Sequence, residues 1–120
     1  MIIDDDLDIT IFFKLALEGA GFDVDVFNDP QKVLLNFKSN YYDLLLIDIR
    51  MPKMNGFELI RKLRKKIPKL KSALSPHLKF YRAMIEEYAS IKKEIGCFIK
   101  KPVTVSDLVR RIKKEMELNR

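Results

Sequence analysis

The sequence predicts an α/β fold in which helices cover both faces of a five-stranded parallel sheet. Short apolar runs alternate with stretches of helical periodicity along 120 residues, a length typical of one domain. The run at 44–47, LLLI, is apolar without interruption, as in a strand buried on both faces. Charged side chains directly follow three of these predicted strands, at residues 4–6, 48 and 100–101. In parallel sheets, ligands bind beyond the carboxyl ends of the strands, so these side chains are candidates for a site.

The first half of the chain contains three predicted strands and two predicted helices. Residues 1–3 form a short apolar strand, and a helix follows that ends at Gly19 to Gly21. Residues 22–26 alternate apolar and acidic side chains, which indicates a half-exposed strand. Asn28 or Asp29 can cap the next helix, and 44–47 is the third strand. The apolar face predicted for the first helix comprises Ile9, Phe12, Phe13, Ala16 and Ala20.

The second half continues the same alternation. A helix follows Gly56 and extends up to Pro68, and the stretch LKSALS is a weak strand candidate. A long helix is expected from His77 to about Glu94, and CFI at 97–99 is the fifth strand. The last helix covers 104–117, where Thr104 and Asp107 have the spacing of a capping box. These elements predict a single domain over residues 1–120.

Composition and charge limit the possible functions. The formal net charge is +6, but acidic residues dominate the first half and basic residues dominate from Arg61 onward. An acidic pocket beside a basic flank therefore describes the chain better than a uniformly basic surface. Cys97 is the single cysteine, and no apolar run approaches the ~20 residues of a membrane span. The N-terminus lacks the pattern of a signal peptide, so a cytoplasmic protein is expected.

The charged residues at the strand ends suggest phosphoryl chemistry. Asp4, Asp5 and Asp48 would meet in one crevice if the first and third strands are neighbours. Clustered carboxylates raise one another's pKa unless a cation intervenes, and Mg²⁺ prefers one or two carboxylates with waters and a phosphate oxygen. Lys101 and Ser75, at the ends of the fifth and fourth strands, could contact an anion held there. The alternative for each residue alone is a solvated or capping role, and only their joint placement favours a site.

Three motifs resemble the receiver domain of two-component response regulators. DDDLDI is similar to the opening acidic motif of that family, DIRMPKMNG to its phosphorylation segment, and FIKKP to its lysine–proline motif. The separations, 43 residues from Asp5 to Asp48 and 53 from Asp48 to Lys101, also agree with the family. The resemblance covers nearly the whole chain. It implies a flavodoxin-like (βα)₅ three-layer sandwich with strand order 2-1-3-4-5.

The resemblance also implies roles for individual residues. Asp48 would be the phosphoacceptor, Lys101 would pair with phosphoryl oxygens, and Ser75 would donate a hydrogen bond to one of them. Mg²⁺ would be the cofactor. Phe98 stands where the family has an aromatic side chain that moves on activation. The implied metal ligands are Asp4, Asp5, Asp48 and the backbone carbonyl of Arg50.

Two segments depart from the family pattern. Only Met1 to Ile3 precede the acidic motif, where the family usually has several more residues. Either the first strand is abbreviated, which should reduce stability, or the start of the chain is incomplete. Pro76 follows Ser75 directly, and Ser72 is an alternative hydroxyl. An alternative function is therefore a binding module that keeps the receiver fold but has a degenerate phosphoswitch.

The resemblance implies a phosphorelay signalling module rather than a turnover enzyme. It would assist only its own aspartyl phosphorylation and dephosphorylation. Its partners would be a sensor histidine kinase and an effector or homodimer partner that contacts the last two helices. Direct nucleic-acid binding is not expected, because no DNA- or RNA-binding motif is present. The basic residues on these helices are Lys79, Arg82, Lys92, Lys93, Arg110, Arg111, Lys113 and Lys114.

Overall fold

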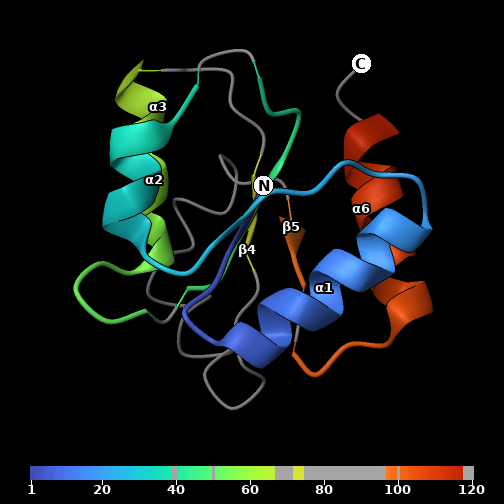
Figure 1. Ribbon diagram of the computed structural model, residues 1–120. Helices are drawn as coiled ribbons and strands as arrows, with labels where there is room; N and C mark the ends of the chain where they lie inside the picture. Colours follow the sequence, from blue (N-terminus) through green and yellow to red (C-terminus); the bar gives the residue numbers. More distant parts are fainter. Residues whose placement is uncertain (39–40, 50, 67–71, 75–96, 100, 118–120) are drawn as a thin grey trace.

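One parallel sheet forms the centre of the molecule (Figure 1). The computed structural model describes residues 1–38, 41–49, 51–66, 72–74, 97–99 and 101–117. The strand order β2-β1-β3-β4-β5, with every neighbouring pair parallel, confirms the predicted fold class and the order implied by the family resemblance. The strands are β1 (Ile2–Ile3), β2 (Val26–Phe27), β3 (Leu45–Ile47), β4 (Ser72–Leu74) and β5 (Cys97–Phe98).

Helices lie on both faces of the sheet. Helices α1 (Leu7–Gly19) and α6 (Val105–Glu117) cover one face, and α2 (Pro30–Asn36) and α3 (Gly56–Lys66) cover the other (Figure 1). The helix predicted at 77–94 lies outside the described residues. Within the described part of the chain, no helix has both the length and the apolar character needed to cross a membrane.

Each face of the sheet has its own apolar core. On the α2/α3 face, Ile3 and Ile47 pack with Val33, Phe57 and Ile60, all at most 1% exposed. On the other face, the buried side chains are Ile2, Phe13, Ala16, Leu17, Leu44, Leu46, Ile99, Leu108 and Ile112. Successive residues of β1 and β3 thus enter opposite cores, as the uninterrupted apolar LLLI run predicts.

Side-chain caps fix where the helices begin. The Asp6 carboxylate accepts hydrogen bonds from the N–H groups of Asp8 and Ile9, which makes it the N-cap of α1. Asp29, rather than Asn28, caps α2. The Asp107 N–H donates to Thr104 Oγ1 at 3.2 Å, half of the capping box predicted before α6.

The predicted apolar face of α1 is partly wrong. Phe12 is 38% exposed and Ala20 is half-buried, whereas Thr10, Phe13, Ala16 and Leu17 are buried. Positions 10, 13, 16 and 17 share one face at helical spacing, so the helix packs with a different rotation from that expected. Because Thr10 is polar and lies on the inward face, a prediction based on apolar side chains alone placed that face incorrectly.

The predicted second strand is also shorter than its pattern. Only Val26–Phe27 forms strand, although the alternation begins at Phe22. The reason lies in β1, whose first strand residue, Ile2, is in register with Val26. Residues 22–25 therefore have the composition of a strand but little neighbouring backbone with which to form a ladder.

Candidate functional site

The sheet itself places two of the predicted acidic residues. The Asp4 N–H donates to the Phe27 carbonyl at 3.1 Å, and the Asp48 N–H donates to the Ile3 carbonyl at 2.8 Å. Each aspartate therefore extends the hydrogen bonding of its strand by one residue. Because β1 lies beside β3, both side chains emerge at the same edge of the sheet.

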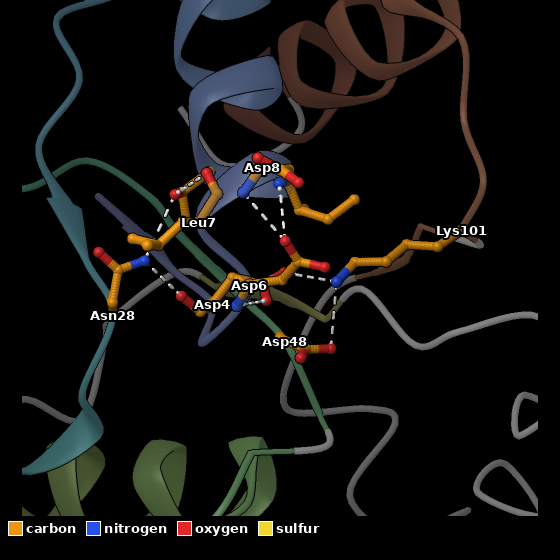
Figure 2. A network of polar contacts seen from close by, with 9 residues as sticks. Asp4, Asp6, Leu7, Asp8, Asn28, Asp48 and Lys101 are labelled. Carbon is orange, nitrogen blue, oxygen red and sulfur yellow. Dashed lines mark hydrogen bonds and ion pairs between the residues drawn. The ribbon is translucent and has the colours of Figure 1, made fainter.

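Three carboxylates and one ammonium meet at this edge. One carboxylate oxygen each from Asp4, Asp5 and Asp48 lies within 4.8 Å of the other two. Lys101 Nζ is 3.2 Å from Asp48 Oδ1 and also forms an ion pair with Asp4 Oδ2 (Figure 2). Asp4, Asp48 and Lys101 are buried, at 2%, 7% and 8% exposure, while Asp5 is exposed. The site is thus a buried charge cluster with one carboxylate facing outward.

Burial controls the electrostatics of Asp48. Desolvation raises the pKa of Asp48 to about 7, although the neighbouring Lys101 ammonium acts in the opposite direction. The Asp4 and Asp5 carboxylates raise this pKa further by repulsion. A bound divalent cation would reverse that repulsion and favour the ionised form.

Two residues that the sequence did not assign to the site, Asn28 and Thr10, hold the first acidic loop. Asn28 Nδ2 donates to the Asp4 carbonyl at 2.8 Å (Figure 2). It also donates to Thr10 Oγ1 at 3.3 Å. The Thr10 hydroxyl donates in turn to the Leu7 carbonyl at 2.8 Å. The Asp6 N–H donates to Asp4 Oδ1 at 3.0 Å, which orients the buried carboxylate. The sequence indicated Asn28 only as a candidate cap of the next helix, not as a support of the acidic loop.

The loop after Asp48 folds back tightly on its strand. Lys53 has a positive φ of 69°, and the Met54 N–H donates to the Pro52 carbonyl at 2.8 Å, a three-residue γ-type turn. The Gly56 N–H then donates to the Ile49 carbonyl at 2.8 Å. A Cβ atom on Gly56 would lie 2.6 Å from the Asp48 carbonyl oxygen, so only glycine fits this approach.

The structure gives less information on the remaining predicted site residues. Arg50 and Ser75 lie outside the described residues, as does His77. Phe98 belongs to β5, but its side chain is not described. The structure therefore brings together Asp4, Asp5, Asp48 and Lys101, and the roles assigned to Arg50 and Ser75 stay predictions.

The donor set suits a hard divalent cation. Three carboxylate oxygens within 4.8 Å of one another match the oxygen ligands that Mg²⁺ prefers. Asp5 is exposed, so a partly hydrated cation could approach from solvent while Asp4 and Asp48 contact it from the buried side. Without such a cation, Lys101 supplies the nearby positive charge.

Comparison with known proteins finds a matching family model and related regulatory proteins. The response regulator receiver domain model matches residues 1–113. Response regulator ArlR of Staphylococcus saprophyticus is 28% identical over 113 residues, which are 94% of this chain and 50% of that protein. The transcriptional regulatory protein CpxR homolog of Haemophilus influenzae is 37% identical over 65 residues, covering 54% of this chain and 28% of that protein. This chain thus spans about half or less of the length of these curated relatives.

Solved structures agree in fold. The CheY-like response regulator receiver domain protein from Methanospirillum hungatei superposes with a TM-score of 0.84 at 29% identity, covering 98% of this chain and 92% of that chain. The receiver domain of the Francisella response regulator 1452 gives 0.82 at 27% identity, covering 99% and 96%. With its parallel sheet and its acidic edge, this chain belongs to the family of two-component response regulator receiver domains.

Proposed function

We propose that this receiver domain accepts a phosphoryl group on Asp48 from a sensor histidine kinase, in a reaction that requires Mg²⁺. The observation that carries the proposal is the placement of the Asp48 carboxylate beside two further carboxylates and 3.2 Å from the Lys101 ammonium. A buried carboxylate beside a cation site and an ammonium has the parts that phosphoryl transfer needs, namely a nucleophile and positive charge to stabilise the phosphoryl oxygens.

The transfer itself is a displacement at phosphorus. A carboxylate oxygen of Asp48 forms a bond to the phosphorus atom, and the bond from phosphorus to the donor nitrogen of phosphohistidine breaks. The electron pair of the broken bond stays on the imidazole nitrogen. Only the ionised carboxylate has an oxygen available for this attack, so the raised pKa of Asp48 must be countered for efficient reaction at neutral pH.

The surrounding residues would counter it. Asp4, Asp5, Asp48 and the Arg50 carbonyl would hold Mg²⁺, which supplies positive charge to the acceptor and to the phosphoryl oxygens. Lys101 would move from its ion pairs with Asp4 and Asp48 to a phosphoryl oxygen. The Ser75 hydroxyl would donate a hydrogen bond to another of these oxygens. Asn28 keeps the Asp4 backbone in place while these contacts change.

The phosphorylated domain would act by changing what it binds rather than by turnover of a substrate. The matched residues make up only 50% of response regulator ArlR and 28% of the CpxR homolog. The output we propose is altered contact with an effector or a second copy through the last two helices. Lys113 and Lys114 of α6 are exposed and could contact an acidic partner, whereas Arg110 already forms an ion pair with Asp107.

The test uses a small phosphodonor in place of the kinase. The protein is incubated with acetyl phosphate and Mg²⁺ and examined by intact mass spectrometry. We expect a gain of one phosphoryl group that disappears in Asp48→Asn and when EDTA is present. Asp23→Asn is the matched control, because it removes an exposed aspartate outside this charge cluster. An equal mass gain in Asp48→Asn would exclude Asp48 as the acceptor.

A further inference from the structure

Asn28, which directly follows β2, connects three segments beside the acidic edge of the sheet. Its side-chain nitrogen donates a hydrogen bond to the Asp4 carbonyl at 2.8 Å (Figure 2). The same nitrogen donates to Thr10 Oγ1 of α1 at 3.3 Å. Because Asn28 is exposed, it contributes these polar contacts rather than packing in either apolar core. One amide group thus joins the end of β2, the acidic loop and α1.

The contact with Asn28 completes the set of polar contacts that hold Asp4. The Asp4 N–H donates to the Phe27 carbonyl at 3.1 Å, and Asp4 Oδ1 accepts from the Asp6 N–H at 3.0 Å. Asp4 Oδ2 forms the ion pair with Lys101. The Asp4 carbonyl is the remaining polar group, and Asn28 supplies its hydrogen-bond donor. Since Asn28 is exposed, a substitution there removes this one contact without changing either core.

The Asp4 carbonyl also determines where the next residue lies. It belongs to the peptide group that joins Asp4 to Asp5, and a peptide group is planar. A carbonyl held in one direction therefore fixes the N–H and the Cα of Asp5 as well. The Asp5 carboxylate is exposed, and among the residues that the structure describes no hydrogen bond or ion pair holds it. Its place within 4.8 Å of the Asp4 and Asp48 oxygens thus depends on its backbone.

Thr10 orients the Asn28 side chain for this contact. Thr10 is 2% exposed, and its hydroxyl donates to the Leu7 carbonyl at 2.8 Å. Because the hydroxyl proton is used there, the oxygen faces Asn28 as an acceptor and selects the nitrogen of the amide. That nitrogen carries two hydrogens, one for Thr10 Oγ1 and one for the Asp4 carbonyl.

We propose that Asn28 is a positioning residue of the cation site. It fixes the peptide group between Asp4 and Asp5, so that the Asp5 carboxylate meets a divalent cation that Asp4 and Asp48 contact from the buried side. Thr10 acts through Asn28 by orienting its amide. This inference rests on the Mg²⁺ site of the proposed function, and neither Asn28 nor Thr10 touches the cation.

The energetic effect of Asn28 is pre-organisation of the ligands. Without its hydrogen bond, the peptide group between Asp4 and Asp5 samples other orientations, and the three carboxylates are together for a smaller fraction of the time. The apparent affinity for the cation falls by that fraction. Residues that hold metal ligands in place in this way affect metal affinity by about 10- to 100-fold in other proteins.

The experiment compares Asn28→Ala with Asn36→Ala. Asn36 is the matched control, because its exposed side-chain nitrogen also donates to a backbone carbonyl, that of Lys32, at 2.9 Å, but within α2. Isothermal titration with Mg²⁺ measures the affinity of each variant, and urea unfolding without divalent cations measures its stability. The NMR chemical shift of the Asp5 amide in the metal-free protein reports the orientation of the peptide group. We expect Asn28→Ala to weaken Mg²⁺ binding by about tenfold and to shift the Asp5 amide, whereas Asn36→Ala changes neither.

Thr10→Val, alone and combined with Asn28→Ala, tests the second part of the proposal. Thr10→Val should weaken Mg²⁺ binding less than Asn28→Ala does, and the double variant should bind as Asn28→Ala does. Additive losses would overturn the action of Thr10 through Asn28.

The outcomes separate this inference from the proposed function. If the parent protein binds Mg²⁺ and Asn28→Ala binds it within about twofold of the parent affinity, the positioning role of Asn28 is overturned and the cation site stands. An equal loss of affinity in Asn36→Ala would also overturn that role, because the effect would then follow general destabilisation. If the parent protein does not bind Mg²⁺, the proposed function fails and this inference fails with it.

Discussion

Replacing Gly56 with alanine tests the close approach between Gly56, at the end of the loop after Asp48, and the Asp48 backbone. The added Cβ would lie 2.6 Å from the Asp48 carbonyl oxygen, 3.0 Å from Ile49 Cα and 3.1 Å from Ile47 Cγ2, where ordinary contacts begin at 3.4 Å. The two closest atoms belong to the backbone of the strand end, so they cannot move aside by a rotamer change. Overpacking of this kind costs about 2–3 kcal/mol.

The assay is urea unfolding followed by circular dichroism. At the usual slope for a domain of this size, that loss lowers the midpoint by about 1–2 M urea. Gly19→Ala is the matched control, because nothing lies within 4 Å of a Cβ atom at the last residue of α1. There the same chemical change should be neutral or stabilise by up to about 1 kcal/mol, since alanine is the better helix former.

The Gly56→Ala variant should also bind Mg²⁺ more weakly than the parent protein. The clash would displace the Asp48 backbone, and the Asp48 carboxylate, the proposed acceptor, would move with it. Isothermal titration under folding conditions measures this affinity directly. If Gly56→Ala unfolded at the parent midpoint and bound Mg²⁺ with the parent affinity, the argument from the close approach of Gly56 would be refuted.

Three further predictions concern the charge cluster and its supports. Lys101→Met leaves the buried carboxylates of Asp4 and Asp48 without their counter-ion. It should destabilise the Mg²⁺-free protein by about 3–5 kcal/mol at about pH 8. A loss of less than about 1 kcal/mol in urea unfolding would contradict this expectation. Burial raises the pKa of Asp48 from 3.8 to about 7, so the folded state holds a proton that the unfolded chain has released. Stability without divalent cations should therefore fall as pH rises from about 4 to about 7. Mg²⁺ should raise the unfolding temperature more at about pH 8 than at about pH 5. Equal increases at both pH values would argue against a raised pKa of Asp48. Asp6→Ala removes the N-cap of α1 and should lower the free energy of unfolding by about 1 kcal/mol, measured by thermal unfolding. The affinity for Mg²⁺ should stay unchanged. A large loss of Mg²⁺ affinity would instead indicate that Asp6 belongs to the cation site.

The sheet and the position of the acidic edge could be predicted because both depend on local pattern. The apolar LLLI run identifies a strand buried on both faces, and a carboxylate directly after it must lie at the strand's carboxyl end. Residue type narrows the cap of α2 to Asn28 or Asp29, since both types are typical N-caps, and the structure then selects Asp29.

Other features depend on contacts between distant segments. The ion pair of Lys101 with Asp4 joins residues from the two ends of the chain, and no spacing rule indicates which carboxylate the ammonium prefers. The length of β2 depends on where β1 begins, not on the alternation of residues 22–26. The rotation of α1 depends on packing against α6 and the sheet, so Phe12 could not be placed from periodicity alone.

The ion pair between Lys101 and Asp4 implies competition for one carboxylate. If the proposed divalent ion bound Asp4 Oδ2, it would compete with the Lys101 ammonium that already contacts this oxygen, so binding the ion and releasing the lysine would be linked events. The Lys101 ammonium, which lies 3.2 Å from Asp48 Oδ1 in this structure, would then be able to pair with a phosphoryl group on Asp48, the acceptor proposed above. The same side chain would thus act first as a stand-in for the metal and afterwards as a partner of the phosphate, so that loading with the ion prepares the acceptor for its reaction.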